Sequence, residues 1–293
     1  MKKLLFLFAL FSNSLLAQSA SVIVFSYNRP MQLFAFLESS DKRCSHIEKT
    51  YVLFRSDNEK SDQGYKIVQN HFPFVSFHQE GNFKKILISL VENTPSKHIA
   101  FAVDDIIITE HINFATCIYA LEKYKAWGFF LRLGKNITSS YFSKEKTPPP
   151  RDGKVIANRF FYWNVMKTSS RCNDWGYPNS LDITLYRKKD ILPYIRHLNY
   201  CNPNTLEKMW ARKKNELTRK KCISFLHSKI INLPLNLVNT SINNPHGSVY
   251  SADFLLDKFL ENYKIDIQTF YKPQNKAPHE DRPITLIPFT SKK

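Results

Sequence analysis

The chain has 293 residues, of which 43% are hydrophobic and 14% aromatic. This composition supplies a sizeable core, so it excludes a wholly disordered chain, and the length suits one large domain or two small ones. Lys and Arg number 42 against 25 Asp and Glu, which gives a net charge of +17. Such a charge attracts nucleotide diphosphates, nucleic acids or an anionic membrane surface, but no specific nucleic-acid module accompanies it.

The N-terminal residues differ in composition from the rest of the chain. A basic start at residues 1–3 precedes a run of mostly Leu and Phe at 4–16, and Ala17 or Ala20 offers a small residue for cleavage. This layout predicts a secretory signal peptide or signal anchor over residues 1–20. We therefore expect an exported or membrane-associated protein, with the side of the membrane left open. A genuine first strand is the alternative.

The cysteines give no sign of a metal knuckle. There are five, widely spaced and without a C-x-x-C pair: Cys44, Cys117, Cys172, Cys201 and Cys222. An odd number at such spacing argues against a disulfide framework. We expect mostly buried free thiols, although an exported protein can still form one or two bridges.

Apolar runs and helical patterns alternate through the first half of the chain. The expected strands and helices are strand 21–26, helix 31–39, strand 50–54, helix 64–71, strand 74–77 and helix 83–92. This βαβα alternation predicts the α/β class, with a mostly parallel central sheet and helices on both of its faces.

Two adjacent carboxylates, Asp104 and Asp105, interrupt the apolar run Ile99–Thr109. The run reads as a strand buried on both faces, and burying two like charges costs several kcal/mol unless a cation offsets them. The carboxyl end of the strand, where α/β sheets open their ligand crevice, is the place where a divalent metal and a diphosphate could share the charge. The alternative is a helix N-terminus at which one Asp is the cap.

The second half is less regular. We expect a helix at 113–125, a strand at 128–133, a mobile loop at 135–150, helices at about 205–214 and 251–263, and a surface tail after Pro273. Tyr162, Trp163 and Trp175 could stack on a sugar, and core packing is the alternative for each.

Four segments together resemble a family 2-type glycosyltransferase with the GT-A fold. They are residues 21–37, the acidic Val103-Asp104-Asp105, residues 185–192 and residues 204–207. Val-Asp-Asp stands where the family has Asp-x-Asp, and a single Glu207 stands for its Glu-Asp pair. The resemblance spans roughly residues 21–270 and implies a GT-A-like nucleotide-binding fold.

The resemblance also implies a division of the chain and an activity. Residues 21–133 would be the nucleotide-sugar half, 134–273 the acceptor half and 274–293 a C-terminal tail. The activity would be metal-dependent transfer of a sugar from a nucleotide-diphosphate donor to an unknown acceptor, with inversion. The partners would be that donor and a glycan, lipid or protein acceptor.

The end of the first strand supplies candidate donor contacts. Ser26, Asn28 and Arg29 would face the base and ribose of the nucleotide, because ligands bind beyond the carboxyl ends of the strands. Asp57, at the next strand end, is a natural partner for a uracil or ribose donor group. Arg29 could instead be a surface residue at a helix start, and Asp57 could be a turn former that bonds its own backbone.

A divalent cation bridging diphosphate oxygens would stabilise the leaving group, and Asp oxygens suit Mn²⁺ or Mg²⁺. Asp105 is the first candidate ligand, with Asp104 on the ribose or on a metal-bound water. The resemblance implies a third ligand from the second half, frequently a His. His246 and His279 are the candidates, and a solvated loop histidine is the alternative for each.

The acceptor hydroxyl must lose a proton, and a carboxylate is the usual base. Glu207 is the first candidate, although Asn204 as an N-cap would make it a capping-box acid instead. Asp182 is the second candidate, with a structural turn as its alternative, and Asp174 is the third.

Two other functions remain open at this point. One is an exported, non-catalytic protein that binds carbohydrate or an anionic surface on the same fold. The other is nucleic-acid binding through charge alone, which predicts a steep dependence on salt and no metal requirement.

Overall fold

The computed structural model describes residues 18–168, 174–238, 246–247, 249–272 and 274–290. Residues 1–17 of the predicted signal segment, and Cys172, lie outside these ranges. Within them, no helix is long and apolar enough to cross a membrane. The four described cysteines are free thiols, of which Cys117 and Cys222 are buried.

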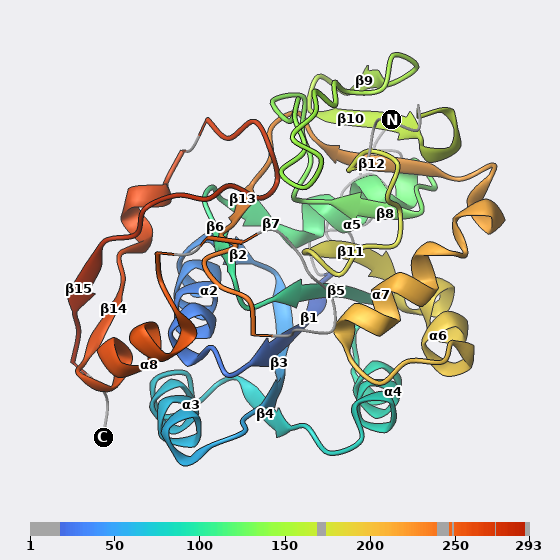
Figure 1. Ribbon diagram of the computed structural model, residues 1–293. Helices are drawn as coiled ribbons and strands as arrows, with labels where there is room; N and C mark the ends of the chain where they lie inside the picture. Colours follow the sequence, from blue (N-terminus) through green and yellow to red (C-terminus); the bar gives the residue numbers. More distant parts are fainter. Residues whose placement is uncertain (1–17, 169–173, 239–245, 248, 273, 291–293) are drawn as a thin grey trace, which may run out of the picture.

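Helices and strands alternate through most of the chain (Figure 1). The helices are α2 (Pro30–Arg43), α3 (Glu59–His71), α4 (Phe83–Asn93), α5 (Phe114–Lys123), α6 (Lys188–His197), α7 (Pro203–Ala211) and α8 (Ala252–Leu260), with short 3-10 turns η1 (Val165–Lys167), η2 (Lys214–Leu217) and η3 (Ile267–Phe270). The strands are β1 (Ala20–Tyr27), β2 (Cys44–Ser45), β3 (Ile47–Arg55), β4 (Ser76–Gln79), β5 (His98–Val103), β6 (Ile106–Ile108), β7 (Ile112–Asn113), β8 (Gly128–Phe130), β9 (Lys154–Ile156), β10 (Phe160–Asn164), β11 (Thr184–Arg187), β12 (Lys221–Phe225), β13 (Ile230–Asn232), β14 (Tyr263–Ile265) and β15 (Leu286–Pro288).

A nine-stranded sheet in the order β4-β3-β1-β5-β11-β8-β12-β10-β9 forms the centre of the protein. Strands β4, β3, β1 and β5 pair in parallel, and so do β8 and β12. Strand β11 lies between β5 and β8 and is antiparallel to both, and β10 is antiparallel to β12 and β9. The predicted α/β class with a mostly parallel central sheet is confirmed.

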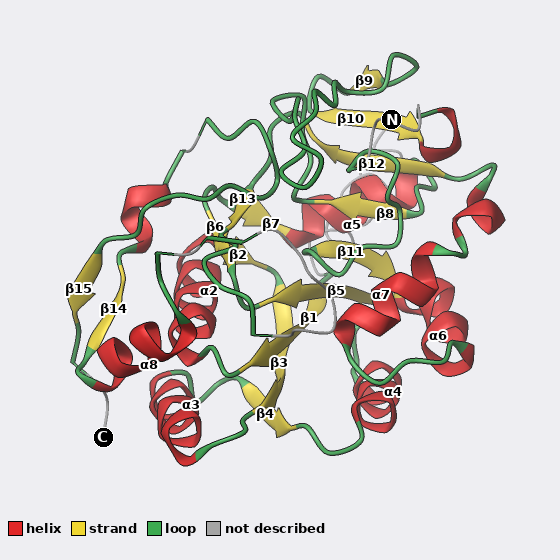
Figure 2. Ribbon diagram, viewed as in Figure 1, coloured by secondary structure: helices red, strands yellow, loops and turns green. Residues whose placement is uncertain are grey.

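The alternation of side chains along β1 shows how the sheet is covered. Val22 and Val24 belong to one buried cluster, and Ile23 and Phe25 to another, because successive side chains of a strand point to opposite faces. The first cluster also contains the buried apolar residues of α2, α3, α5 and α8, and the second contains those of α4, α6 and α7. Helices therefore lie on both faces, as predicted (Figure 2).

Asparagines mark the starts of helices α3, α4 and α5, and also of α7. The side chains of Asn58, Asn82 and Asn113 accept hydrogen bonds from backbone N–H groups three residues on, at the starts of α3, α4 and α5. Each satisfies a donor that the first helical turn leaves unpaired. These local signals hold the helices that follow the parallel strands.

Three sequence predictions need correction. The apolar run 99–109 is not one strand, because the chain turns at Asp104 and Asp105, and β6 leaves the large sheet to pair with β13. The strand expected at 128–133 ends at Phe130. The tail after Pro273 does not simply cover the surface, since Asn275 and Ala277 are buried and β15 pairs with β14.

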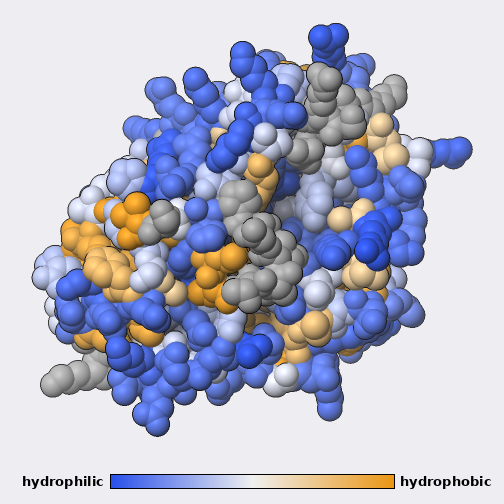
Figure 3. Space-filling model, viewed as in Figure 1, coloured by the Kyte–Doolittle hydropathy of each residue, from blue (hydrophilic) through white to orange (hydrophobic). Residues whose placement is uncertain are grey.

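The outer surface is mostly polar on the face seen in Figure 3. Apolar side chains gather there on the side where α8, β14 and β15 lie. Two of the exposed large hydrophobic residues, Phe254 and Tyr263, belong to α8 and β14.

Candidate functional site

A cleft of about 1090 Å³ opens at the carboxyl ends of β1 and β5. These strands pair in parallel, with Phe25 beside Val103, so the residues that follow each strand meet at the same edge of the sheet. The cleft is lined there by Ser26, Arg29, Asp104 and Asp105. This is the crevice that the sequence predicted from the acidic pair, and the alternative of a helix cap is wrong because no helix starts at these residues.

Arg29 is the cation that offsets the two carboxylates. Its Nη2 lies 2.5 Å from Asp104 Oδ1, its Nε donates to Asp104 Oδ2 at 3.3 Å, and its Nη1 lies 3.2 Å from Asp105 Oδ2. The Arg29 side chain is only 15% exposed, so the alternative of a solvated surface arginine is wrong. Burial works against its charge, but the two carboxylates raise its pKa above the ordinary value.

The two aspartates differ in their surroundings. Asp104 is fully buried, and burial raises its pKa to about 6 despite the opposing effect of Arg29. Asp105 stays partly exposed, and its Oδ1 accepts a hydrogen bond from Asn232 Nδ2 at 2.9 Å. The backbone N–H of Leu233 donates to the Asp105 carbonyl at 2.8 Å. Strand β13 and the residue after it therefore hold the acidic turn from the side opposite Arg29.

The other predicted donor contacts form a polar cluster beside this turn. The Ser26 hydroxyl is 2.7 Å from that of Tyr65. The Asp57 carboxylate accepts hydrogen bonds from the side chains of Tyr27, Asn28 and Arg55. Asp57 thus bonds other side chains rather than acting as a turn former on its own backbone. Asn28 and Asp57 do not line the cleft, but Tyr27 and Arg55 do.

The predicted metal ligands are not arranged as a metal site. Across the described residues, no three His, Cys, Asp or Glu side chains form a group that could hold a metal ion. Asp105 faces Arg29 and Asn232, whereas His279 faces Asp182, with 3.4 Å between His279 Nε2 and Asp182 Oδ2. His246 lines the same cleft. The three residues all line one cleft, but Asp105 and His279 contact different protein groups, so the described residues form no shared site for Mn²⁺ or Mg²⁺.

Both candidate bases lie on the opposite wall of the cleft. Asp182 belongs to the loop before β11, and Glu207 lies in α7. Glu207 Oε1 accepts a hydrogen bond from the backbone N–H of Leu181 at 2.9 Å, so Glu207 is bonded to the loop that carries Asp182. Burial, together with the charge of Asp182, raises the pKa of Glu207 to about 7. A carboxylate with such a pKa is suited to accept a proton near neutral pH.

The alternative role of Glu207 as a capping-box acid is wrong. Helix α7 begins two residues earlier than predicted, with Asn202 as the N-cap and Thr205 completing the capping box. Asn204 is therefore inside the helix, and Glu207 is free of any capping duty. The sequence prediction chose the wrong cap because Asn202 and Asn204 are both plausible N-caps. Pro203 favours Asn202, since proline is preferred at the first position of a helix.

The loop that carries Asp182 is constrained from several sides. The Tyr186 hydroxyl accepts from Ser180 N at 2.9 Å and donates to the Pro178 or Ser180 carbonyl oxygen, each 3.0 Å away. Ile183 has a φ of 38°, in the left-handed region that a β-branched residue rarely adopts. Backbone strain of this kind persists only where surrounding contacts over-determine it, and it gathers at functional sites.

Two further charged residues near the cleft were not singled out as a pair from the sequence. Arg132 and Asp174 are both buried, and Arg132 Nη1 lies 2.6 Å from Asp174 Oδ1. The pairing makes Asp174 unsuitable as a base. An arginine in the apolar segment 128–133 was a usable signal for Arg132, because such a charge needs a buried partner.

The aromatic residues proposed for sugar stacking serve the core. Trp163 and Trp175 are both 1% exposed and pack against each other with ring centroids 4.9 Å apart. The Tyr162 hydroxyl donates to the Tyr124 carbonyl at 3.1 Å. Phe142 and Tyr177, which the sequence did not indicate, line the cleft instead.

No protein-family model matches the chain. A Dictyostelium discoideum protein named bifunctional glycosyltransferase pgtA is 30% identical to it over 264 residues. The match covers 80% of this chain but only 34% of that protein, so the chain spans about a third of its relative's length.

Solved structures of low sequence identity also match. TarS of S. aureus is 15% identical, with 71% of this chain and 35% of that chain covered and a TM-score of 0.46. TarS 1–349 in complex with UDP is 14% identical, with coverages of 72% and 58% and a TM-score of 0.48. A mannosyltransferase of Pyrobaculum calidifontis in complex with GDP-Man and Mn²⁺ is 10% identical, with coverages of 40% and 36% and a TM-score of 0.33. The predicted resemblance to glycosyltransferases is confirmed by the sequence match, which covers 80% of the chain.

Proposed function

We propose that this protein is a glycosyltransferase that moves a sugar from a nucleotide-diphosphate donor to an acceptor hydroxyl. The observation that carries the proposal is the single cleft with two separate carboxylate pairs, Asp104 with Asp105 and Asp182 with Glu207. The first pair lies at the strand ends where nucleotides bind in α/β folds, and the second holds a carboxylate suited to accept a proton. The similarity to a named glycosyltransferase supports the same activity.

In the proposed reaction, the acceptor oxygen attacks the anomeric carbon of the sugar while Glu207 takes the hydroxyl proton. A bond forms between that oxygen and the anomeric carbon, and the bond from this carbon to the diphosphate oxygen breaks. The nucleoside diphosphate leaves with the electron pair of that bond. A single displacement of this kind inverts the anomeric configuration, and we propose inversion for that reason.

The diphosphate needs positive charge at the mouth of the cleft. Lys208 and Arg212 line the cleft one helical turn apart, and neither forms an ion pair with any other described residue. Arg29, by contrast, is already committed to the acidic pair. We propose Lys208 and Arg212 as the diphosphate contacts, and Tyr27, which lines the cleft and is hydrogen-bonded to Asp57, as the contact that receives the nucleoside.

A divalent metal remains a prediction from the resemblance, and no step above is assigned to it. Asp105 is the residue at which Mn²⁺ or Mg²⁺ would add, since it is partly exposed and lines the cleft. Export or membrane association through residues 1–20 likewise remains a proposal, as do an anionic membrane surface as a partner and the division of the chain at residues 133 and 273.

The experiment is a thermal-shift screen of the purified protein against UDP-, GDP-, CMP- and dTDP-sugars, with and without Mn²⁺. A donor at about a hundred times its Kd should stabilise the fold by roughly 2.7 kcal/mol. Any donor that binds is then incubated with the protein, and release of its nucleotide is measured, which is a nucleoside diphosphate for the UDP-, GDP- and dTDP-sugars and CMP for the CMP-sugar. Binding without transfer or hydrolysis would favour the non-catalytic carbohydrate-binding alternative, and no binding at physiological salt would refute the donor site.

A further inference from the structure

A C-terminal segment, Asn275–Arg282, runs beside strand β13 at the edge of the cleft. Asn232 N donates to the Pro278 carbonyl at 2.9 Å, and Glu280 N donates to the Asn232 carbonyl at 3.1 Å. These contacts make a parallel bridge between Asn232 and His279. Since the Asn232 side chain also binds Asp105, this single residue joins the donor-side turn to the segment that carries His279.

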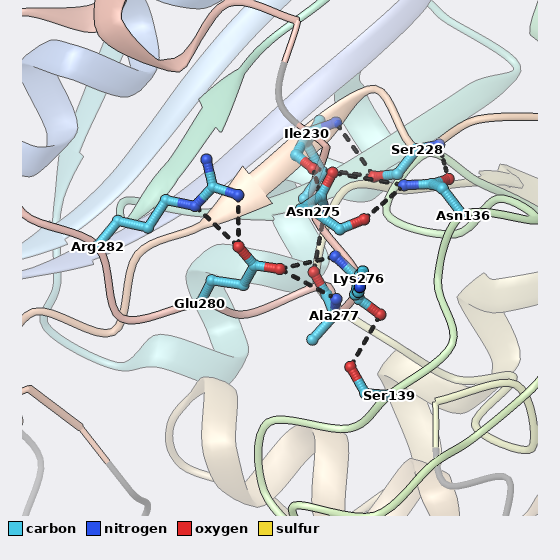
Figure 4. A network of polar contacts seen from close by, with 9 residues as sticks. All are labelled: Asn136, Ser139, Ser228, Ile230, Asn275, Lys276, Ala277, Glu280 and Arg282. Carbon is cyan, nitrogen blue, oxygen red and sulfur yellow. Dashed lines mark hydrogen bonds and ion pairs between the residues drawn. The ribbon is translucent and has the colours of Figure 1, made fainter.

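The segment is fixed on one side of His279 by a polar network (Figure 4). Asn136 Nδ2 donates to the Asn275 carbonyl at 2.9 Å, and Asn275 Nδ2 donates to the Ala277 carbonyl at 3.0 Å. The Lys276 carbonyl accepts from the backbone N–H groups of Thr138 and Ser139 at 2.8 and 3.0 Å. A buried asparagine with these bonds holds the backbone just before His279 in one conformation.

Glu280 fixes the segment on the other side of His279. Its Oε1 accepts from Lys276 N at 2.7 Å, and its Oε2 accepts from Arg282 Nη2 at 2.6 Å. None of the nine residues drawn in Figure 4 lines the cleft. The hydrogen bonds on both sides of His279 together fix the position of this residue.

His279 is placed against the acceptor-side carboxylates. Its side chain is 11% exposed, its Nε2 faces Asp182 Oδ2, and the Phe142 ring lies 4.8 Å from its own ring. Its Nδ1 is buried and has no hydrogen-bond partner among the described residues. Asp182 is thus the polar group that sets the orientation of the imidazole, and the imidazole in turn restrains Asp182.

Any movement of Asp182 would be transmitted to Glu207. The residue before Asp182 donates its backbone N–H to Glu207, and the residue after it has the left-handed φ of Ile183. We propose that His279, delivered by the segment Asn275–Arg282, is a positioning residue that holds Asp182 and thereby Glu207 in the arrangement needed for transfer. This inference rests on the proposed function and gives His279 a role different from that of a metal ligand.

The test compares three variants of the full chain. His279→Ala should lower kcat for sugar transfer by up to about a hundredfold, because a small misplacement of reacting groups costs that much, while donor affinity stays within about twofold. His279→Gln keeps an N–H donor near the position of Nε2 and should recover most of the rate. His227→Ala, at an exposed histidine that does not line the cleft, is the matched control and should behave as the wild type.

A rate for His279→Ala equal to that of the wild type would overturn the proposal. So would an equal loss in His279→Ala and His279→Gln, because the imidazole would then act through more than its contact with Asp182. A loss of donor affinity in parallel with the rate would show a general structural role instead.

A double-mutant cycle in chemical unfolding tests the contact independently of activity. His279→Ala and Asp182→Asn together should cost less stability than the sum of the two single changes, since each single change already removes the same interaction. Additive costs would refute the pair and leave the proposed function intact. A wild-type protein that neither transfers nor hydrolyses any donor sugar would instead refute the proposed function, and the role of His279 with it.

Discussion

The two walls of the cleft, with Asp104 and Asp105 on the donor side and Asp182 and Glu207 on the acceptor side, differ in how closely a cation contacts their carboxylates. On the donor side, Arg29 contacts both Asp104 and Asp105 within 3.3 Å and opposes the effect of burial, which still raises the pKa of Asp104 to about 6. On the acceptor side, the nearest buried arginine, Arg132, is bonded to Asp174, and Glu207 keeps a pKa raised to about 7. The two donor-side carboxylates are thus held by direct contact with a cation, whereas Glu207 forms no ion pair among the described residues and is the carboxylate suited to accept a proton from the acceptor.

The largest expected effect tests the acceptor wall. Glu207→Gln keeps the shape and an acceptor for the Leu181 N–H but cannot take a proton, so transfer should fall by about 10²–10⁴-fold. Donor binding by calorimetry and the melting temperature should stay near those of the wild type. If Glu207→Gln turns over normally and Asp182→Asn does not, the base is Asp182. If neither change matters, the two walls do not differ in the way described.

The next effect tests the donor wall. Arg29→Met leaves two carboxylates without their cation and should lower the free energy of unfolding by about 3–5 kcal/mol. The matched control is Arg55→Met, which removes an exposed pair with Asp57 and should cost at most about 1 kcal/mol. Denaturant titration of both variants measures the difference. Equal costs would show that the acidic pair does not depend on Arg29.

A smaller effect, on the affinity for the donor, tests whether a metal ion acts on the donor side in addition to Arg29. Asp105→Asn should remove the Mn²⁺-dependent part of donor binding, a change of about tenfold or more in Kd, equivalent to about 1.4 kcal/mol. Calorimetry at physiological salt is required, because the net charge of +17 favours weak binding of any phosphate. Asp257→Asn, at an exposed ion pair with Lys60, is the control. Equal affinity with and without Mn²⁺ in the wild type would leave the protein's own cations to hold the diphosphate.

The pH dependence sharpens the same comparison. Glu207 must be ionised to accept a proton, and burial with the charge of Asp182 raises its pKa to about 7. The rate constant kcat/KM should therefore rise with pH through about 7 and level off above it. A profile that is flat between about pH 6 and 8 would contradict the assignment, since an unperturbed carboxylate is fully ionised throughout that range.

The smallest effect lies away from both walls. Asn113→Ala removes the N-cap of α5 and should cost about 1 kcal/mol of stability with no change in transfer. Thermal melting and a rate measurement on the same sample check this. A large loss of activity in this variant would mean that rates follow stability generally, and the contrast between the walls would then lose its meaning.

The donor wall was largely predictable from the sequence because its parts are local. Each of its residues follows an apolar run, and parallel pairing brings the ends of such runs together without further information. Arg29 and Asp104 were therefore both identified, although 75 residues separate them. Their direct contact was not identified, because the pattern shows that a cation is needed but not which one.

On the acceptor wall, the sequence predicted the carboxylate residues but not their contacts. Glu207 and Asp182 were chosen correctly as cleft residues, but the pairing of Asp182 with His279 joins parts of the chain that no local pattern connects. The tail in particular has few large apolar residues, so its composition suggested a surface segment. Its first part, Asn275–Arg282, is held by backbone and amide hydrogen bonds, which leave no periodic signal in the sequence, and only beyond it do Ile284 and Phe289 pack against the core.

The position of β11 has a consequence for how the chain can be made and divided. This strand is synthesised after β5 and β8 yet is inserted between them, with its hydrogen bonds running to both. A nascent chain that has only reached residue 133 would therefore hold two unpaired strand edges facing each other across a gap, and open edges of this kind invite aggregation. A chain cut in the loop between β8 and β9 would therefore leave β5 and β8 without the strand that joins them in the sheet.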